Sequence, residues 1–183
     1  GHEAIVTDGK TVGLRPGVVD CDAARLGQAS GKRGSIAVRD AAELYDGALL
    51  DEIHVEEPAW NDWLLAERER LSDLAVGAIV AQAEQEFAIG HFSKALALAH
   101  RAVTLNRFRE DAHRVVFRAL AATGRKAEAI RRFNDLTAYL AVELGAEPDE
   151  ETRRLAAYLV ETDGGGTAHV VLAHGESGTR GVT

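Results

Sequence analysis

The sequence is poor in the residues that support disulfide scaffolds and membrane spans. Its 183 residues include one cysteine, no methionine and three prolines, and aromatic residues make up 5%. The single thiol, Cys21, has no partner for an internal disulfide and no base beside it that would activate it. No run of 18 apolar residues is present, so we expect no transmembrane helix. These absences indicate a protein of a reducing cytosol.

Motifs for catalysis and metal binding are also missing. No C-x-x-C occurs, no two histidines sit four apart on an expected helix beside a carboxylate, and no G-x-S-x-G is present. The stretch "HVVLAHGESGTRGVT" departs from a phosphate-binding loop because Arg180 stands at its second glycine and Gly181 at its lysine. The sequence therefore predicts no catalytic, cofactor or metal site and no enzyme.

The charges are unevenly distributed along the chain. The net charge is −8, which argues against a grip on nucleic acid by this chain alone. Residues 40–73 carry eleven acids against Arg68 and Arg70, whereas residues 101–135 carry nine Arg or Lys against four acids. This asymmetry is typical either of partner surfaces or of solvated helix faces.

The first 18 residues are expected to form a β-hairpin. "EAIVTDGKTVGL" places apolar β-branched residues on both sides of Asp8-Gly9, the pattern of a type I′ turn, and Pro16-Gly17 ends the second strand. Because an isolated hairpin is marginal in water, we expect it to pack on another part of the protein.

The next part of the chain, residues 19–162, has the apolar spacing of helices. Trp60 and Trp63 stand near the start of the longest one, and we expect both to anchor it to the N-terminal segments. If Trp63 is fully buried, replacing it by alanine would cost roughly 3–5 kcal/mol of stability. The expected helices cover about residues 22–29, 36–45, 58–89, 92–105, 109–122, 126–144 and 149–162.

Four pairs of positions repeat with one offset. Gly90 and Gly124 lie 34 residues apart, and each stands between two expected helices. This is the period of tetratricopeptide repeats, in which each helix pair stacks on the next and a terminal helix covers the end. The fold class predicted is mainly α, a tetratricopeptide-like α–α repeat superhelix. The other pairs are Ala95 and Ala129, Ala99 and Phe133, and Ala102 and Leu136.

Helical repeats usually bind partners in a groove lined by the first helix of each pair. Arg114 and Arg118 there could meet an acidic partner or a nucleic-acid backbone, or pair internally with the acidic residues 40–73. Register predicts these groove residues: Val80, Glu84, Phe87, Asp111, Arg114 and Arg118.

The tail, residues 163–183, begins with three glycines that break the helix and continues into "AHVVLAH", which reads as a strand. We expect this strand to pair with the N-terminal hairpin.

Three stretches resemble a known family. "NDWLLAERERL", "GHFSKALALAHRAVTLNRFREDAHRVVFRALAATGRKAEAIRRF" and "ELGAEPDEETRRL" resemble the bacterial transcriptional activator domain of SARP-type (antibiotic regulatory protein) regulators, over about residues 19–160. The resemblance implies tetratricopeptide-like repeats preceded by a DNA-binding winged helix. "AIVTDGKTVGLRPGVVDCDAARL" is similar to the end of that winged helix, its wing hairpin and the linker. The recognition helix would then lie before residue 1.

The resemblance implies an effector domain of a cytoplasmic transcriptional regulator. Its partners would be proteins, namely a second copy in a homodimer or RNA polymerase, while DNA is bound only through the winged helix. The same family also occurs at the front of large signalling proteins. The alternative is therefore a regulatory interaction module of a multidomain ATPase or nucleotide cyclase.

Overall fold

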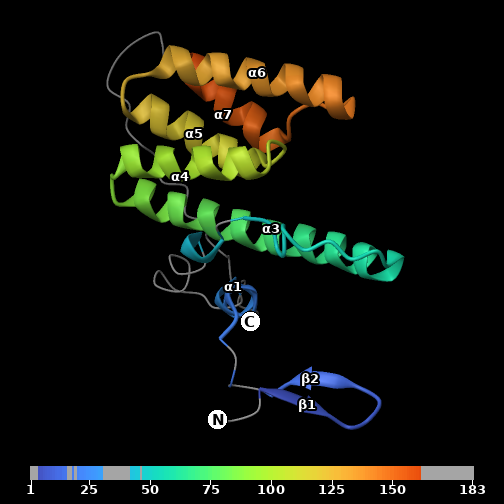
Figure 1. Ribbon diagram of the computed structural model, residues 1–183. Coiled ribbons are helices and arrows are strands. Elements are labelled where there is room, and N and C mark those ends of the chain that lie inside the picture. Colours follow the sequence, from blue (N-terminus) through green and yellow to red (C-terminus); the bar gives the residue numbers. More distant parts are fainter. Residues whose placement is uncertain (1–3, 16–17, 19, 31–41, 46, 162–183) are drawn as a thin grey trace, which may run out of the picture.

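The computed structural model describes residues 4–15, 18, 20–30, 42–45 and 47–161 and confirms the mainly helical fold class (Figure 1). The helices stack one on another, and a small hairpin lies at the N-terminal end. Of the expected helix at 36–45, residues 42–44 are helical and Tyr45 is not, while residues 36–41 lie outside the described residues. The elements are β1 (Ile5–Thr7), β2 (Val12–Leu14), α1 (Asp22–Ser30), α3 (Pro58–Ala88), α4 (Phe92–Leu105), α5 (Glu110–Ala122), α6 (Lys126–Leu144) and α7 (Glu150–Glu161).

The hairpin forms, but its turn differs from the predicted one. Thr7 pairs with Val12, so four residues rather than two connect the antiparallel strands. The Asp8 carboxylate accepts the backbone N–H groups of Lys10 at 2.9 Å and Thr11 at 2.8 Å. A type I′ turn needs positive φ at both central residues. Gly9 has φ 87°, whereas Asp8 does not adopt positive φ, so the type I′ prediction was wrong.

The side chains of both strands are exposed, and within the described part of the chain each strand contacts only the other. The packing partner that we expected for the hairpin is therefore not among the described elements. The predicted pairing with the tail falls on residues 163–183, which lie outside the described residues.

The two glycines 34 residues apart make equivalent turns. Gly90 and Gly124 adopt φ of 83° and 78°, a left-handed conformation that other residues reach only with strain. After each glycine, a backbone N–H reaches the carbonyl five residues earlier, at 2.9 Å for His91 and 2.8 Å for Arg125. This is the Schellman hydrogen bond, which ends a helix and turns the chain sharply. The repeat predicted from the sequence is confirmed at the level of backbone geometry.

The central core lies between α3, α4, α5 and α6. Phe117 and Leu120 of α5 are fully buried, and the Phe117 ring meets Phe133 of α6 edge-on at 6.3 Å. Fully buried alanines such as Ala95 and Ala129 let neighbouring helices approach closely. Helix α7 contacts both α5 and α6 and so covers the end of the stack, as predicted.

At the other end, α1 and the segment 42–53 cover part of α3. Arg101 of α4 donates to the carbonyl of Ala42 at 2.9 Å and to that of Tyr45 at 2.5 Å. Arg68 of α3 donates to the carbonyls of Leu49 at 2.7 Å and Leu50 at 3.0 Å. These two arginines tether the irregular segment to the repeat helices.

The tethered segment holds one unusual backbone conformation. Leu50 has φ 52°, which costs a residue with a side chain roughly 1 kcal/mol or more. The hydrogen bond from Arg68 to its carbonyl helps to hold this conformation.

The N-terminal turns of α3 project beyond the stack (Figure 1). This helix has 31 residues, whereas α4, which packs along it, has 14. Leu71 and Ala75, in the middle of α3, pack near Leu26 of α1. Trp63 lies before this covered part and is 49% exposed, so the expectation that it anchors the helix was wrong and the large cost of Trp63→Ala does not apply.

Candidate partner-binding surface

The first helices of successive pairs line one side of the stack. Helix α5 contacts α3 before it and α7 after it, in addition to its neighbours α4 and α6. The predicted groove residues belong to α3 and α5, on this side.

The two apolar members of the predicted groove are buried within the chain. Val80 belongs to a core cluster with Ala42 and Ile79, so the tethered segment already packs near it. Phe87 packs in the central core, and the guanidinium of Arg118 lies 4.9 Å from its ring centroid. This cation–π contact covers the ring from the outer side.

Arg118 also links two of the lining helices by charge. Its guanidinium forms an ion pair with Glu84 of α3. Both side chains remain partly exposed, at 33% for Arg118 and 43% for Glu84. The pair is therefore screened by water, and a partner could still reach its outer side.

Arg114 links α5 to the capping helix. Its Nη1 donates to Asp149 at 2.7 Å and to the Thr152 hydroxyl at 3.0 Å, and its Nη2 lies 3.1 Å from Glu151. The Asp149 carboxylate in turn accepts the backbone N–H of Thr152 at 2.6 Å, which caps the start of α7. Burial raises the pKa of Asp149, but the hydrogen bonds from Thr152 and Arg114 outweigh it and leave this pKa below its ordinary value.

Asp111 is paired with a neighbour on its own segment. Arg109 donates to the two oxygens of this carboxylate at 3.0 and 2.7 Å, a bidentate geometry. Burial raises the pKa of Asp111, but the bonds from Arg109 outweigh it and keep this pKa below its ordinary value. The same bonds raise the pKa of Arg109.

The structure thus places the six predicted residues without an open apolar groove between them. Of the two roles considered for Arg114 and Arg118, internal pairing is what the geometry shows. Their partners are not in the acidic segment 40–73, however, but in α3 at Glu84 and at the start of α7. The reason is topological, because α5 packs against the C-terminal half of α3 and against α7.

Several interactions had no signal in the sequence. Glu86, whose side chain is 7% exposed, accepts from His91 at 2.9 Å and Lys94 at 2.6 Å across the first repeat turn. The hydrogen bond from Lys94, followed by that from His91, holds the pKa of Glu86 below its ordinary value. The tethers from Arg68 and Arg101 end on backbone carbonyls, which every residue carries, so no residue pattern could reveal them.

His113 is a packed side chain of α5. Its Nε2 lies 3.0 Å from the carbonyl of Arg107, and its ring centroid lies 6.0 Å from that of Phe117. Burial is the main cause that lowers the pKa of His113, and the same holds for His100 of α4, whose pKa Arg132 lowers further.

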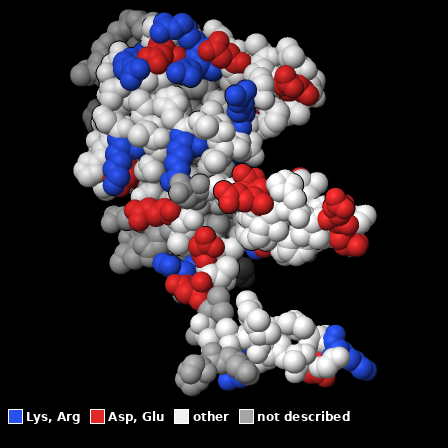
Figure 2. Space-filling model, in the orientation of Figure 1, with Lys and Arg blue, Asp and Glu red and all other residues white. Residues whose placement is uncertain are grey.

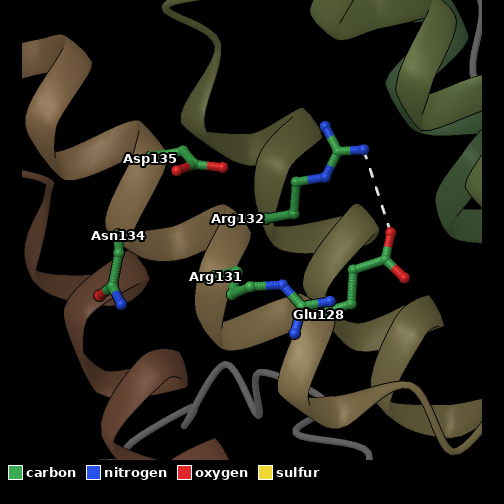
Figure 3. A pocket seen from close by; sticks show the side chains of 5 residues that line it. All are labelled: Glu128, Arg131, Arg132, Asn134 and Asp135. Carbon is green, nitrogen blue, oxygen red and sulfur yellow. Dashed lines mark ion pairs between the residues drawn. The ribbon is translucent and has the colours of Figure 1, made fainter.

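Two hollows lie on the outer part of the stack, away from the predicted groove. The first has about 490 Å³ and a polar lining on one face of α6, where Arg132 lies 4.0 Å from Glu128 (Figure 3). Arg131, also in this hollow, has no ion pair among the described residues. The second has about 420 Å³ and lies between α6 and α7, with Ile130, Phe133 and Ala156 in its lining.

The described part of the chain holds neither a metal-binding cluster nor a membrane-spanning helix. No three or more His, Cys, Asp or Glu side chains gather there in a way that could hold a metal ion. Within the same residues, no helix is both long and apolar enough to span a bilayer.

Comparison with known proteins identifies the family. The model described as the bacterial transcriptional activator domain matches residues 22–159, more than half of the chain. Mycobacterium tuberculosis EmbR in complex with a low affinity phosphopeptide has a similar fold, with a TM-score of 0.61 at 21% sequence identity. The match covers 77% of this chain and 37% of the EmbR chain, so this chain spans well under half of that protein's length. No curated protein matches the chain. The chain belongs to the family of the bacterial transcriptional activator domain.

Proposed function

We propose that this chain is the effector domain of a cytoplasmic bacterial transcriptional regulator and acts through protein–protein contacts. The observation that carries the proposal is the family match over residues 22–159, which coincides with a stack of helix pairs. Such stacks present long surfaces to partners. A separate winged helix binds DNA, and the hairpin at residues 4–15 is the end of its wing. The contacts are with a second copy of the chain and with RNA polymerase.

The first surface to test is the side lined by α3 and α5. Val80 and Phe87 supply the packed base of this surface. Its polar residues, Glu84, Asp111 and Arg118, are ion-paired but stay partly exposed, so a charged partner could exchange with the internal partners. Arg114 of α5 supports the same surface through its ion pairs with Asp149 and Glu151 at the start of α7.

A fusion experiment tests the proposed activity. The chain is joined to an unrelated DNA-binding domain and directed to a site upstream of a weak bacterial promoter. An effector that contacts RNA polymerase raises transcription from this promoter, and exchange of Arg118 for glutamate, which opposes Glu84, reduces that activation. A fusion that is folded and bound to its site but leaves transcription at the level of the DNA-binding domain alone would refute the polymerase contact. Sedimentation over a wide concentration range tests the homodimer, and a purely monomeric chain would refute it.

The second candidate, a regulatory module of a multidomain ATPase or nucleotide cyclase, rests on the same family match. In that case the fusion is inactive. Removal of residues 22–159 from the parent protein then changes the turnover of its nucleotide-consuming region instead.

A further inference from the structure

The projecting start of α3, together with the connector before it, leaves large apolar side chains uncovered, although Leu64 among them is buried. Four large apolar side chains of this part are exposed to solvent: Ile53, Val55, Trp63 and Leu65. Neither α4 nor α5 reaches this part of the helix, as Figure 1 shows. Several large apolar side chains on one projection are typical of an interaction site rather than of ordinary surface.

Connector and helix form a single arm. Arg68 holds the carbonyls of Leu49 and Leu50 beside the middle of α3, whereas the chain enters the helix at Pro58. The helical rise from residue 58 to residue 68 is about 15 Å, so residues 51–57 return along the first turns of α3. Their extended reach of about 23 Å is sufficient for this path. We call residues 51–66 the acidic arm.

Two tryptophans dominate the apolar part of the acidic arm. The ring centroids of Trp60 and Trp63 lie 5.0 Å apart in a tilted pair. The Nε1 of Trp60 is buried yet has no hydrogen-bond acceptor in the described structure. Buried indole N–H groups normally have an acceptor, and tryptophan is the residue most enriched among binding hot spots. The exposed ring of Trp63, rather than the covered N–H of Trp60, is the part of the pair that a partner can contact.

The charge of the acidic arm specifies the partner. Residues 51–66 contain five acids and no Lys or Arg. One acid, Asp51, lies 3.9 Å from Arg68. The other four form no ion pair within the described part of the chain. Figure 2 shows this projection as a largely uncharged surface bordered by acidic groups. The remaining acids are Glu52, Glu56, Glu57 and Asp62.

We propose that the acidic arm binds a basic amphipathic helix of a partner protein, with Trp63 as the apolar anchor and the four unpaired carboxylates facing the partner's lysines or arginines. A nucleic acid is excluded by charge. The apolar face of such a helix fits the exposed apolar side chains of the acidic arm, and its basic face fits the carboxylates of the arm. The inference rests on the proposed function, because it names the partner chemistry of an interaction domain.

The two tryptophans make the test direct. They are the only ones in the chain, so intrinsic tryptophan fluorescence reports on the acidic arm alone. The probe is a synthetic amphipathic helix of about 14 residues made of leucine and lysine, and the matched control has glutamate in place of each lysine. We expect a saturable blue shift with the lysine peptide and none with the glutamate peptide.

Variants locate the binding. Trp63→Ala lowers the affinity of the chain for the lysine peptide about thirtyfold, as expected for a hot-spot residue. Glu56→Lys combined with Glu57→Lys lowers this affinity at least about tenfold. The double variant alters no buried side chain, so it keeps its fold. The matched control reverses two exposed acids on α6, Asp135→Lys with Glu143→Lys, and leaves the affinity unchanged.

Three results would overturn the inference: no shift up to about 1 mM peptide, equal binding of the glutamate peptide, or equal loss in the α6 control. A blue shift that grows with protein concentration in the absence of peptide would show that the acidic arm binds a second copy of the chain. A blue shift produced by adding the upstream part of the parent protein would show that the acidic arm makes an intramolecular contact. Either result also replaces the proposal. If the promoter fusion activates transcription but the unmodified chain does not bind the peptide, or the arm variants bind it as tightly as the unmodified chain, the inference fails alone. If the fusion is inactive but the peptide binds as described, the proposed function fails alone.

Discussion

The contacts of Arg114 predict that this residue holds the capping helix in place. Replacement by methionine keeps a side chain of similar length but removes the guanidinium. The change breaks the bonds to Asp149 and Thr152 and the ion pair with Glu151. The Arg114 side chain is 16% exposed, so its charge is shielded from water on most sides.

The size of the effect follows from the exposure of the partners. Hydrogen bonds to charged groups contribute about 1.5–3 kcal/mol when buried. Glu151 is 77% exposed, so its ion pair adds no more than about 0.5 kcal/mol. Asp149 is 46% exposed, which reduces its contribution too, while Thr152 is fully buried and loses a partner. We expect Arg114→Met to lower the free energy of unfolding by about 2 kcal/mol, and the melting temperature by about 4–8 °C.

Urea unfolding followed by circular dichroism measures the total loss, and amide hydrogen exchange shows where it occurs. Because Arg114 reaches residues at the start of α7, protection should fall in α7 before it falls in α3. The matched control is Arg131→Met, an arginine without an ion pair in the described structure, which should change stability by less than about 0.5 kcal/mol. Equal effects of the two substitutions, or a loss of protection spread evenly over all helices, would refute the reasoning.

Five other substitutions test the repeat, its core and the packed histidine. Gly124→Ala should lower the free energy of unfolding by about 1 kcal/mol, because Gly124 has positive φ. Gly77 lies inside α3 with open space for a methyl group, so Gly77→Ala should raise the free energy of unfolding by up to about 1 kcal/mol. Thermal melts of the two variants test both expectations. Phe117→Ala should cost about 3–5 kcal/mol in urea unfolding, and the half-exposed Phe108→Ala much less. Burial lowers the pKa of His113, so on acidification the unfolded chain binds a proton at this histidine before the folded chain does. The contribution of neutral His113 to the free energy of unfolding is therefore complete above about pH 6.5 and is lost as the pH falls through the pKa of the folded state. Urea midpoints of His113→Gln should therefore fall less steeply than those of the parent chain on acidification.

The helix boundaries were predictable because local signals set them. The prediction of 92–105 and 126–144 agrees with α4 and α6, since a glycine in a left-handed conformation stands before the first and after the second. The 34-residue offset gave the pairing of helices, because each turn is made by the same backbone hydrogen bond. Periodicity of apolar residues and the turn chemistry of glycine carried this part of the fold.

The surface was less predictable, because it depends on how far each helix is covered. Apolar spacing marked Trp63 as a core residue, but α4 is too short to cover the start of α3. The sequence contains many acids that could form ion pairs with Arg114 and Arg118. Only the packing of α5 against α3 and α7 determines that Arg118 pairs with Glu84 and Arg114 with Asp149. At Asp8-Gly9, the dipeptide indicated a tight turn, whereas the carboxylate of Asp8 stabilises a longer loop.

The tethers from Arg68 and Arg101 have a consequence for how this protein can change over evolution. Both arginines bind main-chain oxygens of the segment 42–53, and every amino acid, proline included, carries such an oxygen. These tethering hydrogen bonds therefore depend on two side chains in the repeat helices and hardly on the amino-acid sequence of the segment itself. Where neither buried packing nor the acidic arm constrains it, as at the exposed residues 47 and 48, the segment is free to vary between relatives while its path over the helices is retained.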